Sequence, residues 1–354
     1  MRNNKIASIE LLRFLSSMMI LIWHYQHFFY PYNLFSKIEI LKDNSLQPFF
    51  KIISIFYTHG QIGVDIFFAI SGFVFSYIYI NNETKALPRN FWLNRFSRLY
   101  PLHFLTLFII LFLQNISLKF YGTYQITSVN DIYHFILNIF FISGWGFEKN
   151  YSFNSPIWSV SLELIIYALF FLTIINTKKF IYLKALSVFI TLLILRKLNF
   201  FDKSYIINFE LIVKYGSIFY TGVIAYFLYD KFDKRILLFI LSIILILISF
   251  TGNFKILTFC PGILILFLSF ESFLNVKLRK IFCLLGDLTY SMYLLHLPLQ
   301  ILLILLIKIN NINMDIFLND LFFLNYIMLV ILVSYVSFHK FEKKINTKIK
   351  EIFK

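Results

Sequence analysis

The sequence has few charged residues, two cysteines and no long polar stretch. Asp, Glu, Lys and Arg together make up 14% of its 354 residues, whereas 59% are hydrophobic and the mean hydropathy is +0.75. This composition excludes an ordinary soluble globular domain. Because no hydrophilic block interrupts the apolar segments, we expect residues 1–354 to form a single membrane domain without an appended soluble domain.

The cysteines and the N-terminal region exclude two further classes. Cys260 and Cys283 fall in or beside predicted spans, toward opposite membrane faces, so the sequence supports neither a disulfide nor a metal site. No small-residue cleavage site follows the first apolar run, which is also too long for the core of a signal peptide. We therefore expect this run to remain as an uncleaved membrane anchor.

The net charge of +15 does not indicate a nucleic-acid partner. The basic residues form short clusters between apolar segments and near the C-terminus, the positions that membrane topology favours for Lys and Arg. We interpret these clusters as cytoplasmic topology signals that also contact anionic membrane lipid.

The apolar segments predict an all-α polytopic membrane protein with about ten transmembrane helices, at about twenty residues per span. Both termini and most basic clusters are expected on the cytoplasmic side. On the opposite side, residues 131–144 are expected to form an interfacial or re-entrant helix. The predicted spans cover residues 7–29, 61–81, 99–118, 155–176, 181–199, 206–229, 236–251, 256–271, 284–307 and 321–340.

Arg13 and His24 are unusual residues for the first of these spans. They are about three helical turns apart, which places both on one helix face, roughly 16 Å apart along the axis. A charge near the bilayer centre costs at least ~2.5–3.5 kcal/mol, so such a pair suggests a functional site. The alternative is structural: an arginine that reaches the interface and a histidine that bonds a neighbouring helix.

The next two spans carry polar groups with two open interpretations each. Asp65 opens the second span and either caps it or acts in chemistry, while Ser71 and Gly72 permit close helix packing. Arg95 and Arg98 are three residues apart on the cytoplasmic side of the third span. They either set the topology or hold a phosphate group with two guanidinium groups on one helix face.

Two later spans carry further ionisable groups. Glu163 lies about two turns inside the fourth span, where a carboxylate must pair, accept a proton or meet water. It is expected to orient His24 or to pair with Arg13. His296 lies in the ninth span and is interpreted as a supporting residue. His27 is expected near the outer membrane interface.

Five segments in this order resemble the acyltransferase-3 family of integral membrane acyltransferases, over nearly the whole chain. The final FHKFEKK lacks the proline that the family pattern leads us to expect after the glutamate. The segments are IELLRFLSSMMILIWH with Glu10, Arg13 and His24; GVDIFFAISGF; Arg95-x-x-Arg98 followed by LYP; WSVSLE ending at Glu163; and GDLTYSMYLLH ending at His296.

The resemblance implies transfer of an acyl group, most often acetyl, from cytoplasmic acyl-CoA to a hydroxyl of an extracytoplasmic glycan such as O-antigen or capsule. The expected location is the bacterial cytoplasmic (inner) membrane. His24 would act as general base, and Glu163 would orient it or stabilise its protonated form. Arg13 is a third candidate catalytic residue. Arg95, Arg98 and Arg13 would bind the phosphates of acyl-CoA, with no metal ion involved. Helix spacing also predicts that Arg13 pairs with Glu10, one turn earlier.

Two alternatives are open at this point. An acyl-histidine intermediate on His24 would replace general-base catalysis. A transporter or flippase that moves a lipid-linked glycan or an acyl donor, without making or breaking bonds, would also suit a bundle of helices with intramembrane charges. The length of the acyl chain is not encoded in any motif of the sequence.

Overall fold

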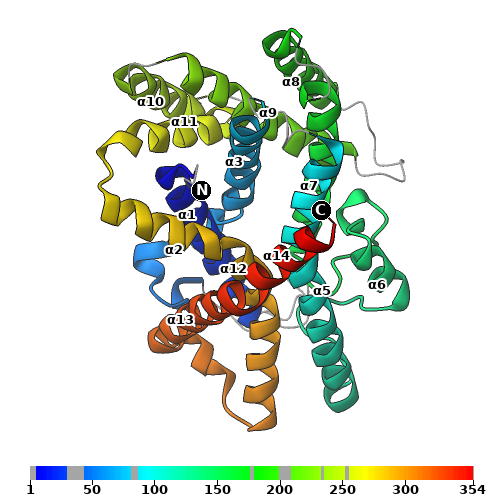
Figure 1. Ribbon diagram of the computed structural model, residues 1–354. Helices are drawn as coiled ribbons and strands as arrows, with labels where there is room; N and C mark the ends of the chain where they lie inside the picture. Colours follow the sequence, from blue (N-terminus) through cyan, green and yellow to red (C-terminus); the bar gives the residue numbers. More distant parts are fainter. Residues whose placement is uncertain are drawn as a thin grey trace. The chain divides into compact units, whose positions relative to one another are not determined.

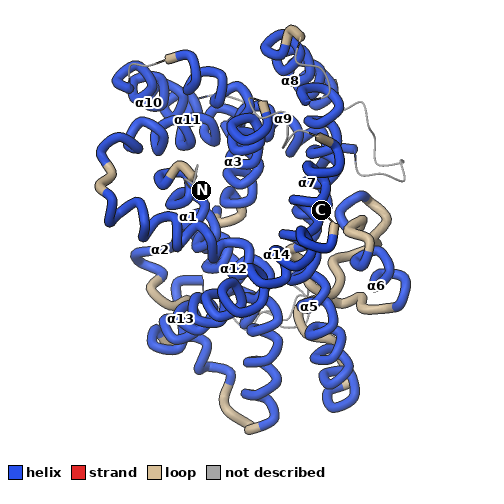
Figure 2. The backbone as a smooth tube through the Cα atoms, in the orientation of Figure 1, coloured by secondary structure: helices blue, strands red, loops and turns tan. Residues whose placement is uncertain are grey.

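A computed structural model describes residues 5–29, 44–80, 87–175, 179–198, 209–232, 235–251 and 255–353. These residues form helices joined by turns and loops (Figure 1). Figure 2 shows the same arrangement by secondary structure, and no strand occurs in the ranges given. The predicted all-α class is therefore confirmed.

The α-helices differ widely in length, from 8 residues in α6 to 34 in α5 and α12. They are α1 (Ala7–His24), α2 (Phe50–His59), α3 (Ile62–Tyr79), α5 (Pro88–Tyr121), α6 (Ile132–Ile139), α7 (Ile157–Phe170), α8 (Ile181–Lys197), α9 (Phe209–Lys231), α10 (Arg235–Thr251), α11 (Lys255–Phe270), α12 (Val276–Ile309), α13 (Asp320–Ser337) and α14 (Lys343–Ile352).

Short helical turns extend or connect several of these helices. Two are π-helical: η4 (Phe171–Ile175) continues α7, and η7 (Phe338–Glu342) joins α13 to α14. The others are 3-10 turns: η1 (Tyr25–Phe28), η2 (Asn44–Leu46), η3 (Ser143–Trp145), η5 (Glu271–Phe273) and η6 (Met314–Leu318).

Eight helical stretches in the described ranges are long and apolar enough to cross a membrane, by length and composition. The protein is thus a polytopic membrane protein. Each predicted span coincides with an observed helix, but α8 and α10 have only 17 residues each. Such helices are about 26 Å long, at the short end of what spans a hydrocarbon core of ~30 Å. The predicted cytoplasmic side of both termini stays a prediction.

Several helices differ from their predicted bounds. The helix predicted at 99–118 begins at Pro88, and the one predicted at 284–307 begins at Val276. Hydropathy finds only the apolar centre of a helix, whereas polar residues such as Lys and Arg continue a helix well. In residues 131–144 the helix is limited to α6, about 12 Å long, and turns follow it.

The chain divides into two compact units, each built from separate segments. Unit 1 comprises Met1–Ser16, Ile62–Trp92 and Ser161–Asp287, and unit 2 comprises Ser17–Gln61, Leu93–Val160 and Leu288–Lys354. Four of the five boundaries fall inside α1, α5, α7 and α12, and the fifth lies between α2 and α3. Each of these four helices therefore contributes residues to both units.

Unit 1 contains a close crossing of α3 and α9. A Cβ atom added to Gly72 of α3 would lie 1.9 Å from the backbone oxygen of Phe219, and one added to Gly222 of α9 would lie 1.8 Å from that of Ala69. Small residues let two backbones approach in this way. The predicted packing role of Gly72 is therefore confirmed. In the same unit, α10 and α11 lie side by side along most of their length (Figure 1).

Unit 2 is organised around aromatic side chains beside the end of α1. Tyr25 is fully buried and donates a hydrogen bond of 2.8 Å to the backbone oxygen of Phe317. Its ring contacts those of Phe323 and Tyr326 of α13, at centroid distances of 4.9 and 5.7 Å. These contacts hold the C-terminal end of α1 against α13.

Candidate functional site

Two histidines from different helices meet in unit 2. His24 is the last residue of α1, and His296 lies within α12. The Nδ1 atom of His24 is 2.7 Å from the Nε2 atom of His296, and the rings are inclined by 13° with centroids 4.8 Å apart. Stacked rings cannot bring two atoms so close, because van der Waals contacts between carbons are ~3.5–4.0 Å. The imidazoles therefore lie edge to edge, joined by a hydrogen bond.

The backbone on both sides of this pair is held by hydrogen bonds. The side chain of Gln300 on α12 donates to the backbone oxygen of His24 at 2.8 Å, and the hydroxyl of Tyr326 donates to that of His296 at 3.3 Å. His296 is 1% exposed, whereas His24 is only half-buried. The more accessible ring of the pair is thus the one for which the sequence predicts a catalytic role.

His27 lies in the turn η1 and is buried in unit 2. It is 4% exposed, and its ring centroid lies 5.1 Å from that of His24. Its Nδ1 atom is buried without a hydrogen-bond partner in the described part of the chain. The expectation that His27 lies near the outer membrane interface stays a prediction.

The part of α12 that carries His296 is anchored to the first turn of α7 and to the segment before it. The hydroxyl of Tyr293 is 2.7 Å from the hydroxyl of Ser159 and donates to the backbone oxygen of Pro156 at 2.9 Å. The buried amide of Asn154 donates to the backbone oxygen of Leu294 at 3.0 Å. Such bonds stabilise polar groups buried in a membrane protein. They also fix the position of this part of α12 relative to residues 154–159.

Arg13 lies in unit 1, where it pairs with Glu10 of the same helix. Their charged atoms are 3.0 Å apart, and Glu10 is 7% exposed. This bears out the predicted pairing one turn apart. Gly286 makes room for it, because a Cβ atom there would lie 2.1 Å from the Oε2 atom of Glu10. Binding of acyl-CoA by Arg13 stays a prediction.

The N-terminus of α1 is held by a buried carboxylate in the same unit. Glu271 accepts hydrogen bonds from the backbone N–H groups of Ala7 and Ser8, at 3.3 and 2.7 Å. Arg279 forms an ion pair with the same carboxylate. A negative charge at a helix N-terminus is favoured by the helix dipole and satisfies free N–H groups.

Glu163 also belongs to unit 1. The hydroxyl of Ser71 donates to it at 3.2 Å, and the hydroxyl of Tyr167 donates to its other carboxylate oxygen. Asp65 lies in the first turn of α3 and is 6% exposed. A carboxylate at the start of a helix fits the predicted interaction with the helix dipole. The expectation that Glu163 orients His24 stays a prediction.

Arg95 and Arg98 lie on α5 in unit 2, three residues apart, and both are half-buried. This confirms that they occupy a helix, where this spacing puts two side chains on one face. The following turn is fixed to α12, because the hydroxyl of Tyr290 donates to the backbone oxygen of Leu99 at 2.5 Å. Their contact with a phosphate group stays a prediction.

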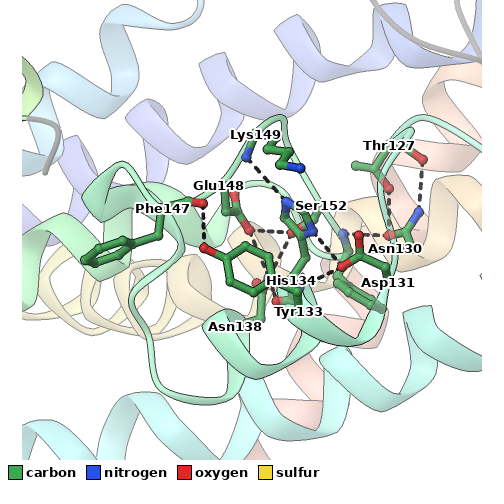
Figure 3. Close-up of polar contacts among 11 residues, drawn as sticks. Thr127, Asn130, Asp131, Tyr133, His134, Asn138, Phe147, Glu148, Lys149 and Ser152 are labelled. Atoms are coloured by element: carbon green, nitrogen blue, oxygen red, sulfur yellow. Dashed lines mark hydrogen bonds and ion pairs between the residues drawn. The ribbon is translucent and has the colours of Figure 1, made fainter. Parts of the chain in front are cut away.

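A polar network closes the loops around α6 (Figure 3). Asp131 caps the helix by accepting from the backbone N–H of His134, and its carboxylate is 2.7 Å from the Nδ1 atom of the same residue. These bonds hold the pKa of Asp131 below its ordinary value. Glu148 accepts hydrogen bonds from Ser152 and Asn138, and burial raises its pKa to about 7.

We expect the protection of these loops against amide hydrogen exchange to fall as the pH rises through about 7. The folded state binds the proton of Glu148 more tightly than the unfolded state does. The resulting contribution to stability is complete below the ordinary carboxyl pKa and is lost as the pH rises above the raised pKa. Amide exchange of residues 127–152 measures the effect. At pH 5, wild type and Glu148→Gln should be equally protected, whereas at pH 8 wild type should exchange faster. Equal exchange at pH 8 would contradict the expectation.

Comparison with known proteins decides the classification of this chain. The profile of the acyltransferase-3 family, described as an acyltransferase domain, matches residues 6–339. The chain belongs to the acyltransferase-3 family. The acyltransferase MdmB of Streptomyces mycarofaciens is 34% identical to it over 115 residues, which is 32% of this chain and 28% of that protein. The chain thus matches less than a third of the length of this curated relative. No solved structure matches the chain.

The pairing of His24 with His296 is the main feature of this acyltransferase-3 chain that sequence reasoning missed. Depth along the helix was the available signal. His24 is predicted about two thirds of the way through the span at 7–29, and His296 is near the middle of the span at 284–307. Two histidines at similar depth in spans of the same direction are candidates for contact. Among the described residues, no group of three or more His, Cys, Asp or Glu is placed to hold a metal ion.

Proposed function

We propose that this member of the acyltransferase-3 family transfers an acyl group, most often acetyl, from cytoplasmic acyl-CoA to a hydroxyl of an extracytoplasmic glycan. The proposed location is the bacterial cytoplasmic membrane, and the proposed acceptors are O-antigen, capsule or a related polymer. The observation that carries the proposal is the hydrogen-bonded pair of His24 and His296 in a chain of this family.

In the proposed reaction His24 acts as general base. It takes the proton of the acceptor hydroxyl while the hydroxyl oxygen attacks the thioester carbonyl carbon. A carbon–oxygen bond forms, the carbon–sulfur bond breaks, and the CoA thiolate leaves and takes up the proton. Imidazole suits this role because it titrates near neutrality. Glu163 would orient His24 or stabilise its protonated form, as the third group of a relay does.

The test is release of free CoA from acetyl-CoA by the purified protein in lipid nanodiscs, with and without extracted surface glycan. Release that requires glycan supports acyl transfer. Absence of release with any short acyl-CoA, across glycans from matched hosts, would contradict it and favour a transporter that makes no bonds.

Arg95 and Arg98 are proposed to hold the phosphates of the donor. The double variant Arg95→Ala/Arg98→Ala is expected to raise the KM for acetyl-CoA at least tenfold with a smaller change in kcat, because charge-assisted bonds from Arg to phosphate contribute about 1.5–3 kcal/mol each. The measurement is CoA release at varied acetyl-CoA concentration.

A matched control removes the same charge elsewhere. Lys343 and Lys344 are exposed on α14 in the same unit, and their double alanine variant should leave the KM for acetyl-CoA unchanged. If the arginine variant behaves like this control, the two arginines act in topology rather than in donor binding.

A further inference from the structure

The hydrogen bonds of His296 define where its proton lies. Its Nδ1 atom is 3.1 Å from the backbone oxygen of Met292, one helical turn earlier on α12. A carbonyl oxygen only accepts hydrogen bonds, so the Nδ1 atom of His296 must carry the hydrogen. A neutral imidazole has one N–H group, which leaves the Nε2 atom of His296 as a lone pair.

The surroundings of His296 favour this neutral form. The residue is 1% exposed in a membrane-spanning helix, where an unpaired charge costs several kcal/mol, as an order of magnitude. Its described interactions are with His24, His27, Met292, Tyr293 and Tyr326. These partners carry no negative charge that would stabilise an imidazolium.

The proton of His24 follows from that of His296. The Nε2 lone pair of His296 is 2.7 Å from the Nδ1 atom of His24 and lies in nearly the same plane. Such a contact requires a hydrogen on one of the two atoms, so the Nδ1 atom of His24 must donate. The lone pair of His24 is then on Nε2, the atom on the side of the ring away from His296.

We propose that His296 is a positioning residue that holds His24 in the Nδ1–H tautomer and thereby makes Nε2 the basic atom. Its consequence for catalysis rests on the proposed acyl transfer. The acceptor hydroxyl gives its proton to the Nε2 atom of His24, and the resulting imidazolium keeps its Nδ1–H bond to His296. The same Nε2 atom then returns the proton to the departing CoA thiolate, so both imidazoles end the reaction neutral.

The arrangement is comparable to a serine protease triad. There, a third group bonds the ring nitrogen of the histidine that does not take the proton, and so selects the tautomer of that histidine. Here a neutral histidine fills that position, so of the two roles proposed for Glu163 only stabilisation of the protonated form of His24 is left. A neutral partner suits the membrane interior, because it selects the tautomer without a buried negative charge. Gln300 and Tyr326, which bond the backbone of His24 and His296, hold both rings at the required height.

The experiment is nitrogen-15 solid-state NMR of the histidine-labelled full chain in lipid nanodiscs, where protonated and unprotonated ring nitrogens have distinct shifts. The chain has seven histidines, and the signals of His24 are those lost in His24→Asn. We expect His24 to show a protonated Nδ1 and an unprotonated Nε2. A protonated Nε2 with an unprotonated Nδ1 on His24 would overturn the proposal.

Two variants extend the test to catalysis. In His296→Leu no acceptor remains, so His24 should shift toward the Nε2–H tautomer and kcat should fall at least tenfold, with the KM for acetyl-CoA unchanged. In His296→Gln the amide oxygen replaces the Nε2 atom, so the tautomer and part of the activity should return. An unchanged tautomer in His296→Leu would contradict the proposal.

The NMR spectra are recorded without catalytic turnover, so they test the tautomer of His24 independently of the proposed function. If wild type shows the expected tautomer but no acyl transfer, the proposed function fails while the hydrogen-bond assignment stands. If wild type transfers acyl groups with the opposite tautomer, the proposed function stands and the positioning role of His296 fails. If His296→Leu does not fold, the wild-type spectrum alone decides the tautomer.

Discussion

The variant His24→Ala should lose acyl transfer by about 10²–10⁴-fold in kcat, because a positioned general base contributes about that factor. The loss corresponds to about 2.7–5.5 kcal/mol of transition-state stabilisation. His24 is expected to be the base because its half-buried ring is the accessible member of the pair with His296. Glycan-dependent release of CoA measures the effect.

A matched control is available within the same unit. His59 is exposed at the end of α2, and within the described residues its ring bonds the hydroxyl of the adjacent Thr58 at 2.7 Å. His59→Ala should therefore keep wild-type activity. Both variants should reach the membrane at normal abundance, because alanine suits a helix end and leaves the backbone bond from Gln300 intact. Retained activity in His24→Ala would remove this histidine as the base.

The variant Gly222→Ala is expected to have the largest effect on stability. Its added Cβ atom would lie 1.8 Å from the backbone oxygen of Ala69, and helix backbone cannot retreat as a side chain can. Overpacking a tight core costs about 1–3 kcal/mol, and a clash with backbone should exceed that range. The crossing of α3 and α9 would have to open, which would also displace Gly72 from Phe219. We expect a large loss of thermal stability and of yield in detergent.

Gly216 provides the control on the same helix. A Cβ atom there would lie 3.4 Å from a methyl carbon of Leu192, which is ordinary contact. Gly216→Ala should be neutral or stabilising, since alanine favours a helix over glycine by about 1 kcal/mol. The measurement is the midpoint of thermal unfolding for both variants in one detergent. If the two midpoints agree, the close approach of α3 and α9 does not contribute to stability.

Prediction from sequence succeeded for side-chain arrangements that the geometry of a single helix determines. The pairing of Glu10 with Arg13 follows from helix spacing alone, and so does the common face of Arg95 and Arg98. It did not predict the burial of His27 beside His24, beyond the C-terminal end of α1. Spacing within a regular helix predicts a side chain only as far as that helix continues.

Composition determined that this is an all-helical membrane protein, because a chain with 59% hydrophobic residues must satisfy its backbone inside lipid, and apolar segments of this length do so as helices. The order of the motifs determined the family. Only the tertiary structure decided that His24 meets His296 and that Gly72 and Gly222 face opposing backbones. Hydropathy is a property of one segment, whereas these contacts depend on the register and rotation of two helices far apart in the chain.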